Sequence, residues 1–171
     1  NSVPADVRIE TYVRAKTMEA IEATHTKVDA ALKAGGDAVG AQTVIATMPG
    51  QLPLACNNRL NELFVANAKI AEPNVAVKDA GHFSASTDMG DVSHLLPVIH
   101  PFIGGVDGFL HTADFHVVDF KHAVLLPAKA FAMMIIDLLA DDAELARQIK
   151  AEHHPLLTKE EYIAKLDKYF Q

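Results

Sequence analysis

Apolar and polar residues alternate near the start of the chain, and the pattern then changes to a helical one. The alternation favours a strand that has Pro4 near its start and apolar residues at Val3, Val7, Ile9 and Val13. From Thr17, a predicted N-cap, apolar residues recur at helical spacing until Gly35-Gly36 ends the helix. A β-branched, apolar run over 42–48 predicts a second strand, which completes a strand-helix-strand unit.

The residues after this unit predict a second lobe. Pro49-Gly50 and Pro53 punctuate the chain, so we expect the lobe boundary at residue 53. Helical spacing then predicts a helix over 57–71. Short strands are expected over 75–77 and 95–102, the second irregular because it contains two prolines.

The last third of the chain is expected to be helical. A long helix over 122–139 is apolar nearly all round, which indicates that it lies against a sheet and under other elements. Asp141-Asp142 are expected to cap a polar helix through Glu152. Thr158 followed by Glu161 forms a capping box that opens a final helix through Tyr169.

These elements predict an α/β protein with lobes at 1–53 and 54–171. The number of predicted strands is too small for the long apolar helix, because this helix needs a sheet broad enough to cover it. The second lobe supplies few strands of its own. The sequence therefore predicts that part of the sheet is missing from these residues.

Composition and charge exclude several classes of function. The 15 basic and 22 acidic residues give a net charge of −7. The sequence has no stripe of basic residues that could bind a phosphate backbone, so nucleic acid is not an expected partner. The apolar stretch 123–140 is interrupted by Pro127, Lys129 and Asp137, so we expect no membrane span. Residues 1–10 do not resemble a signal peptide, and the single cysteine, Cys56, suits a reducing compartment. The expected location is the cytoplasm.

Histidines are the strongest candidates for chemistry. Five of the nine fall between residues 82 and 116 and alternate with aspartates: His82, His94, His100, His111 and His116, with Asp88, Asp91, Asp107 and Asp114. Imidazole and carboxylate together suit zinc, manganese or cobalt. Their spacing matches no self-contained metal motif, and most single histidines lie on the surface or bond within a core. Glycines 104, 105 and 108 would let the backbone aim His111 in an unusual direction.

Other reactive residue types are expected to have structural roles. Ser84, Ser86, Thr87 and Ser93 lack the glycines of a nucleophile elbow and suit turns or helix caps. Glu160-Glu161 lie at a predicted helix start, where carboxylates cap the helix. Arg14, at the end of the first strand, either binds a carboxylate through two hydrogen bonds or is a surface arginine.

Two segments carry a resemblance to a known family. Asn1-Ser2-Val3-Pro4, followed by Arg14, is similar to the Asn-x-x-Pro…Arg signature that ends the lid domain of the zinc aminoacylase and carboxypeptidase family. Residues 86–93, Ser-Thr-Asp-Met-Gly-Asp-Val-Ser, followed by Pro97, resemble a segment of its amidohydrolase branch, which includes the aminobenzoyl-glutamate hydrolase B subunit. Leu110-His111-Thr112 resembles the late metal-ligand histidine of that branch, and residues 143–145 and 150–153 fit the same subgroup.

The resemblance implies a partial two-lobed metallo-exopeptidase fold. The chain would hold the end of the α+β lid (dimerisation) domain and the C-terminal part of the α/β catalytic domain. Such enzymes hydrolyse amide bonds of N-acyl amino acids, aminobenzoyl-glutamate or small peptides at a two-metal centre of zinc, manganese or cobalt. His111 would bind metal, Arg14 the substrate carboxylate, and Asn1 the substrate across a homodimer, with Ser86, Thr87 and Asp88 lining the pocket.

The resemblance also implies that the chain alone is inactive. The family's His-x-Asp ligands, its Glu-Glu pair and its lid histidine are not among these residues. Two alternatives follow from the residues themselves. The chain could be a non-catalytic module that pairs with a copy of itself or with a partner chain, or a metal-binding protein that uses its central histidines.

Overall fold

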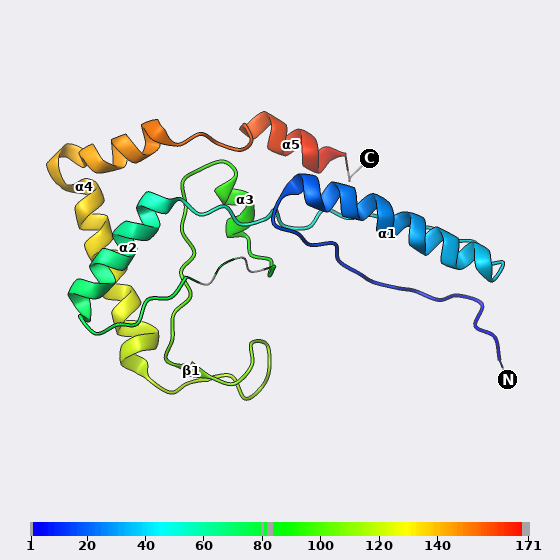
Figure 1. Ribbon diagram of the computed structural model, residues 1–171, viewed down its shortest axis with the longest axis horizontal. Coiled ribbons are helices and arrows are strands. Elements are labelled where there is room, and N and C mark those ends of the chain that lie inside the picture. Colours follow the sequence, from blue (N-terminus) through cyan, green and yellow to red (C-terminus); the bar gives the residue numbers. More distant parts are fainter. Residues whose placement is uncertain (1, 80, 82–83, 169–171) are drawn as a thin grey trace.

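A computed structural model describes residues 2–79, 81 and 84–168. Along the chain lie α1 (Met18–Ala38), α2 (Asn58–Ala71), α3 (Met89–Ser93), β1 (Val106–Asp107), β2 (His116–Val117), a π-helical turn η1 (Lys121–Leu125), α4 (Leu126–Glu152) and α5 (Lys159–Asp167). The molecule is elongated: α1 extends away at one end, α2 and α4 lie together at the other, and α3 lies between them (Figure 1).

Helix α1 begins at the predicted cap and ends later than predicted. The Thr17 hydroxyl accepts a hydrogen bond from the Ala20 amide at 3.3 Å. The helix continues through Gly35-Gly36 to Ala38, so the predicted end was wrong, because glycine lowers helix propensity by only about 1 kcal/mol. Gly36 has its own reason to be a glycine: a Cβ there would collide with Thr43 on the returning chain.

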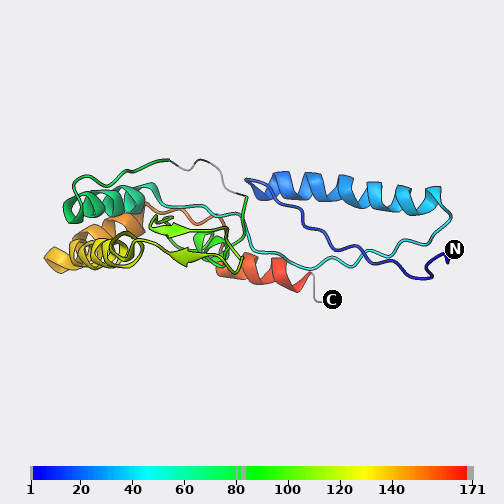
Figure 2. The ribbon, with the colours of Figure 1, turned by 90° about the horizontal axis from the view of Figure 1, so that it is seen from below.

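The predicted strands over 3–13, 42–48, 75–77 and 95–102 are not strands of a sheet. Within the described ranges the only ladder joins β1 to β2, antiparallel, with Val106 opposite Val117 and Asp107 opposite His116. The two segments that flank α1 run as extended chain beside it (Figure 2). A strand forms only where a second strand offers its amides and carbonyls, and local alternation cannot supply that partner. Apolar residues of these segments stay in water; Val3 is 92% exposed and Val44 82%.

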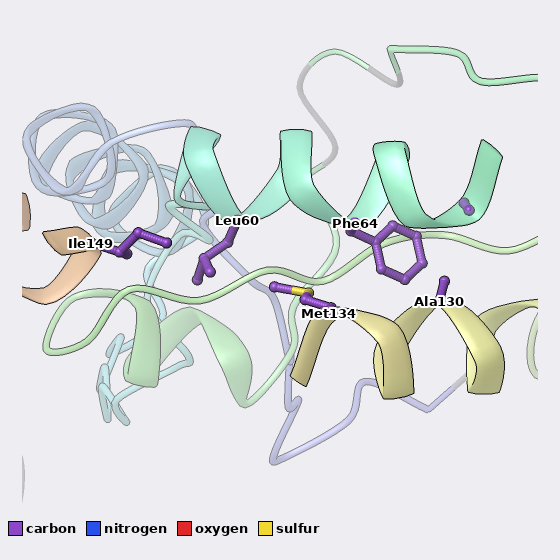
Figure 3. Close-up of a cluster of buried hydrophobic side chains, with 6 residues drawn as sticks. Leu60, Phe64, Ala130, Met134 and Ile149 are labelled. Atoms are coloured by element: carbon purple, nitrogen blue, oxygen red, sulfur yellow. The ribbon is translucent and has the colours of Figure 1, made fainter. Parts of the chain in front are cut away.

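The core lies between α2 and α4. Asn57 caps α2, its side chain accepting from the Leu60 amide at 3.0 Å, which confirms the predicted helix. Leu60 and Phe64 face Met134 and Ala130 of α4, with Ile149 at the far end of the cluster (Figure 3). The Phe64 ring lies 4.9 Å from the Phe131 ring. This apolar cluster, which we call the seam, packs one side of α4 against α2.

Helix α4 has a break where the sequence predicts one helix to end and the next to begin. Residues 140–143 are not helical, and Asp141, Asp142 and Ala143 have positive φ. The predicted sheet over this helix is absent from the described residues. Large apolar side chains remain exposed on η1, at Leu125, and on α4, at Ile135, Ile136 and Leu139. We expected Pro127, Lys129 and Asp137 to exclude a membrane span. By length and composition alone, however, the run Lys121–Glu152 is long and apolar enough to cross a membrane.

The last helix follows its sequence signal closely. Thr158 and Glu161 form the predicted capping box at the start of α5, with both reciprocal hydrogen bonds present. The helix ends at Asp167, and the predicted end at Tyr169 lies outside the described residues.

The chain buries little of its surface for its size. Its accessible surface is 12786 Å². A compact monomer of this mass exposes about 8,200 Å², so about 4,600 Å² more is open here than in a typical single domain. The open surface includes many large apolar side chains, such as Val44, Met48 and Phe109.

Candidate functional site

Segment 86–94, which carries the most specific part of the resemblance, is hydrogen-bonded to residues 51–55, far from it in the sequence. The Gln51 amide donates to the Asp88 carboxylate. The Ser93 hydroxyl donates to the Gly90 carbonyl at 2.5 Å and accepts from the Ala55 amide at 3.0 Å. A ring nitrogen of His94 lies 2.9 Å from the Pro53 carbonyl oxygen. These bonds hold α3 against residues 51–55, and we call the contact the α3 clamp.

Gly90 makes this clamp possible. A Cβ at Gly90 would collide with the Leu52 carbonyl oxygen, so the two backbones can approach only because residue 90 is glycine. Ser93 is 2% exposed and His94 6%, and both are satisfied by the bonds described above. Ser93 therefore has the structural role that its sequence context predicts, and His94 is held in the core rather than free to bind a metal.

The clamp also reaches α2 and α5. The Leu157 amide donates to the His94 carbonyl at 3.0 Å, and the Asn57 amide donates to the Val98 carbonyl at 2.8 Å. Burial raises the pKa of the Tyr162 phenol above its ordinary value, and the nearby charge and hydrogen bond of Asp91 raise it further. Segment 86–98 is thus the point where the separate elements meet.

Two of the predicted substrate-binding residues lie at one site. Arg14 and Ser86, far apart in sequence, both line a small hollow of about 70 Å³, together with Tyr12 and Gln51. The Arg14 guanidinium lies over the Tyr12 ring, 5.1 Å from its centroid. Asp88 is joined to this hollow through Gln51.

The remaining substrate-binding predictions have different outcomes. Thr87 supports the turn before α3: its hydroxyl accepts from the Met89 amide at 3.4 Å, and its carbonyl accepts from the Gly90 amide at 2.8 Å. It is not among the residues that line the hollow. Asn1 lies outside the described residues.

His111 lies exposed in the loop between β1 and β2, not in a core. Its φ is +67°, a left-handed conformation that costs most residues free energy. Gly105 and Gly108 also have positive φ, +90° and +86°, and a Cβ at either would meet backbone atoms at 2.6 Å. The predicted need for glycine is therefore confirmed at 105 and 108, whereas Gly104 has open space around it.

Among the described residues, the central histidines His94, His100, His111 and His116 do not form a metal site with one another. In the part of the chain that the structure describes, no three His, Cys, Asp or Glu side chains lie close enough to hold a metal ion. His94 is bound to Pro53, and Nδ1 of His116 lies 2.6 Å from the Asp114 carbonyl. A catalytic zinc needs about three protein ligands, so His111 alone does not fit a complete centre.

Sequence reasoning missed a larger hollow, of about 370 Å³, at the start of α2. It is lined by residues from both ends of the second lobe, including Cys56, Arg59, Glu152, His153 and His154. Arg59 and Glu152 form an ion pair at 2.5 Å, and Nε2 of His153 is buried with no hydrogen-bond partner among the described residues. The only sequence signal for it was Cys56 beside the Asn57 cap.

A charged cluster anchors the start of η1. The Asp119 carboxylate accepts from the His122 amide at 3.1 Å and lies 2.6 Å from Nδ1 of the same residue. The His122 side-chain hydrogen bond, followed by its backbone one, holds the pKa of Asp119 below its ordinary value. Lys121 pairs with Glu72 at the end of α2, which lowers the pKa of Glu72 and raises that of Lys121.

No family model, no curated protein and no solved structure matches this chain. Its candidate site is therefore argued from its own residues.

Proposed function

We propose that this chain is the C-terminal portion of a metal-dependent amidohydrolase. The substrates would be N-acyl amino acids, aminobenzoyl-glutamate or small peptides, and the enzyme would be cytoplasmic. The observation that carries the proposal is the convergence of Arg14 and Ser86 on one hollow. These residues come from the two segments with the family resemblance, and both line the same hollow although they are far apart in sequence.

Arg14 would bind the substrate carboxylate. The Arg14 guanidinium carbon lies 5.1 Å from the centroid of the Tyr12 ring, within cation–π range, and a guanidinium can form paired hydrogen bonds with a carboxylate. Gln51 and Ser86 add polar groups beside it. The site therefore suits a small anionic substrate with a planar carboxylate.

His111 would supply one ligand to a metal pair, of zinc, manganese or cobalt. Its exposure and its left-handed backbone support this role, since strain of this kind gathers at functional positions. The described residues do not complete the centre, so the proposal assigns the other ligands and the proton-transferring glutamate to further polypeptide. When bound, the metals would supply Lewis-acid activation of the amide.

The partner of the first lobe would be a second copy. The extended segments beside α1 leave apolar side chains in water, including Val7 and Met48, and extended chain of this kind pairs readily with another strand. The proposal includes a homodimer through residues 1–53, with Asn1 reaching the partner's substrate.

The experiment is performed on the protein as its source cells make it. We expect an intact mass well above 18.5 kDa, bound zinc, and hydrolysis of N-acetyl amino acids or aminobenzoyl-glutamate. His111→Ala should remove zinc and activity, whereas His116→Ala, in the same hairpin, should keep both. An 18.5 kDa species with neither zinc nor hydrolysis would overturn the proposal.

A non-catalytic module is the second candidate, and the open surface of 12786 Å² favours it. A chain that leaves so many large apolar side chains in water can exist to hold a partner. Light scattering separates the two candidates, because a stable homodimer of the 171-residue chain, isolated from its source cells without hydrolase activity, would support the module.

A further inference from the structure

Three successive residues inside α4 have left-handed backbone conformations. Asp141, Asp142 and Ala143 have φ of 49°, 58° and 58°, and Ala140 before them is extended, with ψ of 158°. In this conformation the Cβ lies close to the following carbonyl oxygen, so residues other than glycine adopt it singly rather than in succession. We call residues 140–143 the α4 hinge, and the two halves of the helix meet there at a clear angle (Figure 1). The hinge is therefore a strained bend.

The residues around the hinge favour a straight helix instead. Residues 137–147 contain neither glycine nor proline, and most of them are leucine, alanine, glutamate or arginine, which are strong helix formers. Regular helix lies on both sides of the hinge, so the chain could run as one helix from Leu126 to Glu152. The bend is therefore imposed by the contacts of the residues that follow it, not by the local sequence.

Residues 144–168, which follow the hinge, are held against the rest of the molecule. Ile149 is 3% exposed and joins Leu60 of α2 in the core cluster (Figure 3). Glu152 forms an ion pair with Arg59 of the same helix at 2.5 Å. Later residues of the segment are bonded to the α3 clamp and to α1. Straightening the hinge within one chain would break these contacts, so a single chain keeps the bend.

A second copy of the chain offers the same contacts without the bend. We infer that two copies exchange residues 144–168, so that α4 of each copy runs straight through the hinge and its end packs on the core of the other. Exchange of an identical segment keeps every contact of that segment, and strain in a short hinge favours it. The three left-handed residues become helical in this dimer. Association costs the two chains freedom of movement, so the bent monomer predominates in dilute solution and the exchanged dimer at high concentration.

The exchanged dimer does not rest on the proposed function. The homodimer proposed there pairs residues 1–53 and leaves α4 bent, whereas the exchanged dimer straightens α4. Substitutions at the hinge therefore distinguish the two dimers.

A matched pair of variants at the exposed residue Asp141 tests the exchange. Alanine is the best helix former and suits the left-handed conformation poorly, whereas glycine adopts that conformation readily and is a poor helix former. Asp141→Ala should therefore lower the Kd of the dimer at least about tenfold, and Asp141→Gly should raise it at least about tenfold, because each dimer contains two hinges. Lys150→Ala and Lys150→Gly, at an exposed position that is helical in both forms, should leave the Kd unchanged. Each 171-residue chain is refolded over a range of concentrations, and light scattering measures its mass.

Spin labels measure whether α4 straightens. The labels are attached at Ala132→Cys and Lys150→Cys in a Cys56→Ser chain, which lacks the single native thiol. In a continuous helix these two positions are about 27 Å apart along the axis. In the dimer, formed with an excess of unlabelled chain, this separation should appear, and it should exceed the separation in the dilute monomer.

Three results would overturn the inference: a chain that stays monomeric up to its solubility limit, equal Kd values for Asp141→Ala and Asp141→Gly, or a label separation that is the same in monomer and dimer. A dimer that is indifferent to residue 141 and is lost with Val44→Glu would also overturn it, because such a dimer forms through residues 1–53.

Discussion

The Nδ2 amide of Asn67 in α2 donates to Oδ2 of Asp137 in α4 at 2.7 Å and also to the Leu63 carbonyl at 3.1 Å. Asn67 is 2% exposed, so this bond is the polar contact at the centre of an apolar seam. The bond lies on the side of α4 that packs against α2, beside Ala130 and Met134. The two helices are therefore oriented by a specific pair as well as by apolar packing.

Replacing this amide by a carboxylate should loosen the seam. Asn67→Asp loses the donor to Asp137 and places two carboxylates beside each other. We expect the free energy of unfolding to fall by about 1–3 kcal/mol. Urea unfolding followed by circular dichroism measures it, with Asn61→Asp on the same helix as the control. Equal effects of the two variants would show that the bond has no special role.

Gly90→Ala should open the α3 clamp. The added Cβ would collide with the Leu52 carbonyl, and overpacking of this kind costs about 1–3 kcal/mol. We expect a lower unfolding midpoint and faster proteolysis within 50–55. Gly104→Ala is the matched control, since nothing lies within 4 Å of the position of its Cβ. A Gly90→Ala protein as stable and protease-resistant as the control would contradict the clamp.

His111→Gly should stabilise the hairpin. Glycine adopts φ of +67° without the steric cost that a Cβ imposes, so we expect a gain of about 1 kcal/mol in the isolated chain. His116→Gly, in strand β2, should instead destabilise it. If the source-cell enzyme loses its zinc with His111→Gly while the hairpin gains stability, the histidine is kept for function at a cost in stability. If His111→Gly destabilises the hairpin, the claim that His111 is strained at its positive φ is contradicted.

The Asp119 anchor should weaken in acid. The folded pKa of Asp119 is lowered, mainly by the His122 side chain, so its stabilisation is present above the ordinary value of 3.8 and is lost as pH falls through the lower folded pKa. An NMR titration should show the Val118 and His122 amide resonances moving together below pH 3.8. Asp119→Asn should abolish this movement, and Asp107→Asn should leave it. A titration midpoint of Asp119 above pH 3.8 in the parent chain would contradict the lowered pKa.

The caps could be predicted from sequence because they depend on neighbours. Thr17, Asn57 and Thr158 each bond to an amide three residues ahead, and each opens its helix where expected. The break after Leu139 lies where Asp141-Asp142 were expected to cap a helix, but these residues have positive φ and the Asp142 carboxylate accepts from Arg147. Gly35-Gly36 misled because its effect on helix propensity is small beside the length of α1.

The sequence predicts strands over 3–13, 42–48, 75–77 and 95–102 that do not pair in a sheet among the described residues. Alternation over 3–13 describes which side of a strand would be buried, not whether another strand lies beside it. The meeting of Arg14 with Ser86 also depends on the α3 clamp, whose parts are scattered over 51–55 and 86–94. Of the arguments from sequence, only the family resemblance predicted that Arg14 and Ser86 belong to one site.

The substrate role of Arg14 can be measured directly with two ligands that differ in one group. The source-cell protein, loaded with zinc, is assayed for kcat/KM on an N-acetyl amino acid and on its C-terminal amide, which lacks the carboxylate. Arg14→Lys should reduce kcat/KM for the acid about 10–100-fold, the loss of one charge-assisted hydrogen bond, and leave the amide unchanged. Arg8→Lys on the same segment should change neither. Equal losses on both substrates, or no hydrolysis of either by the parent protein, would contradict the account.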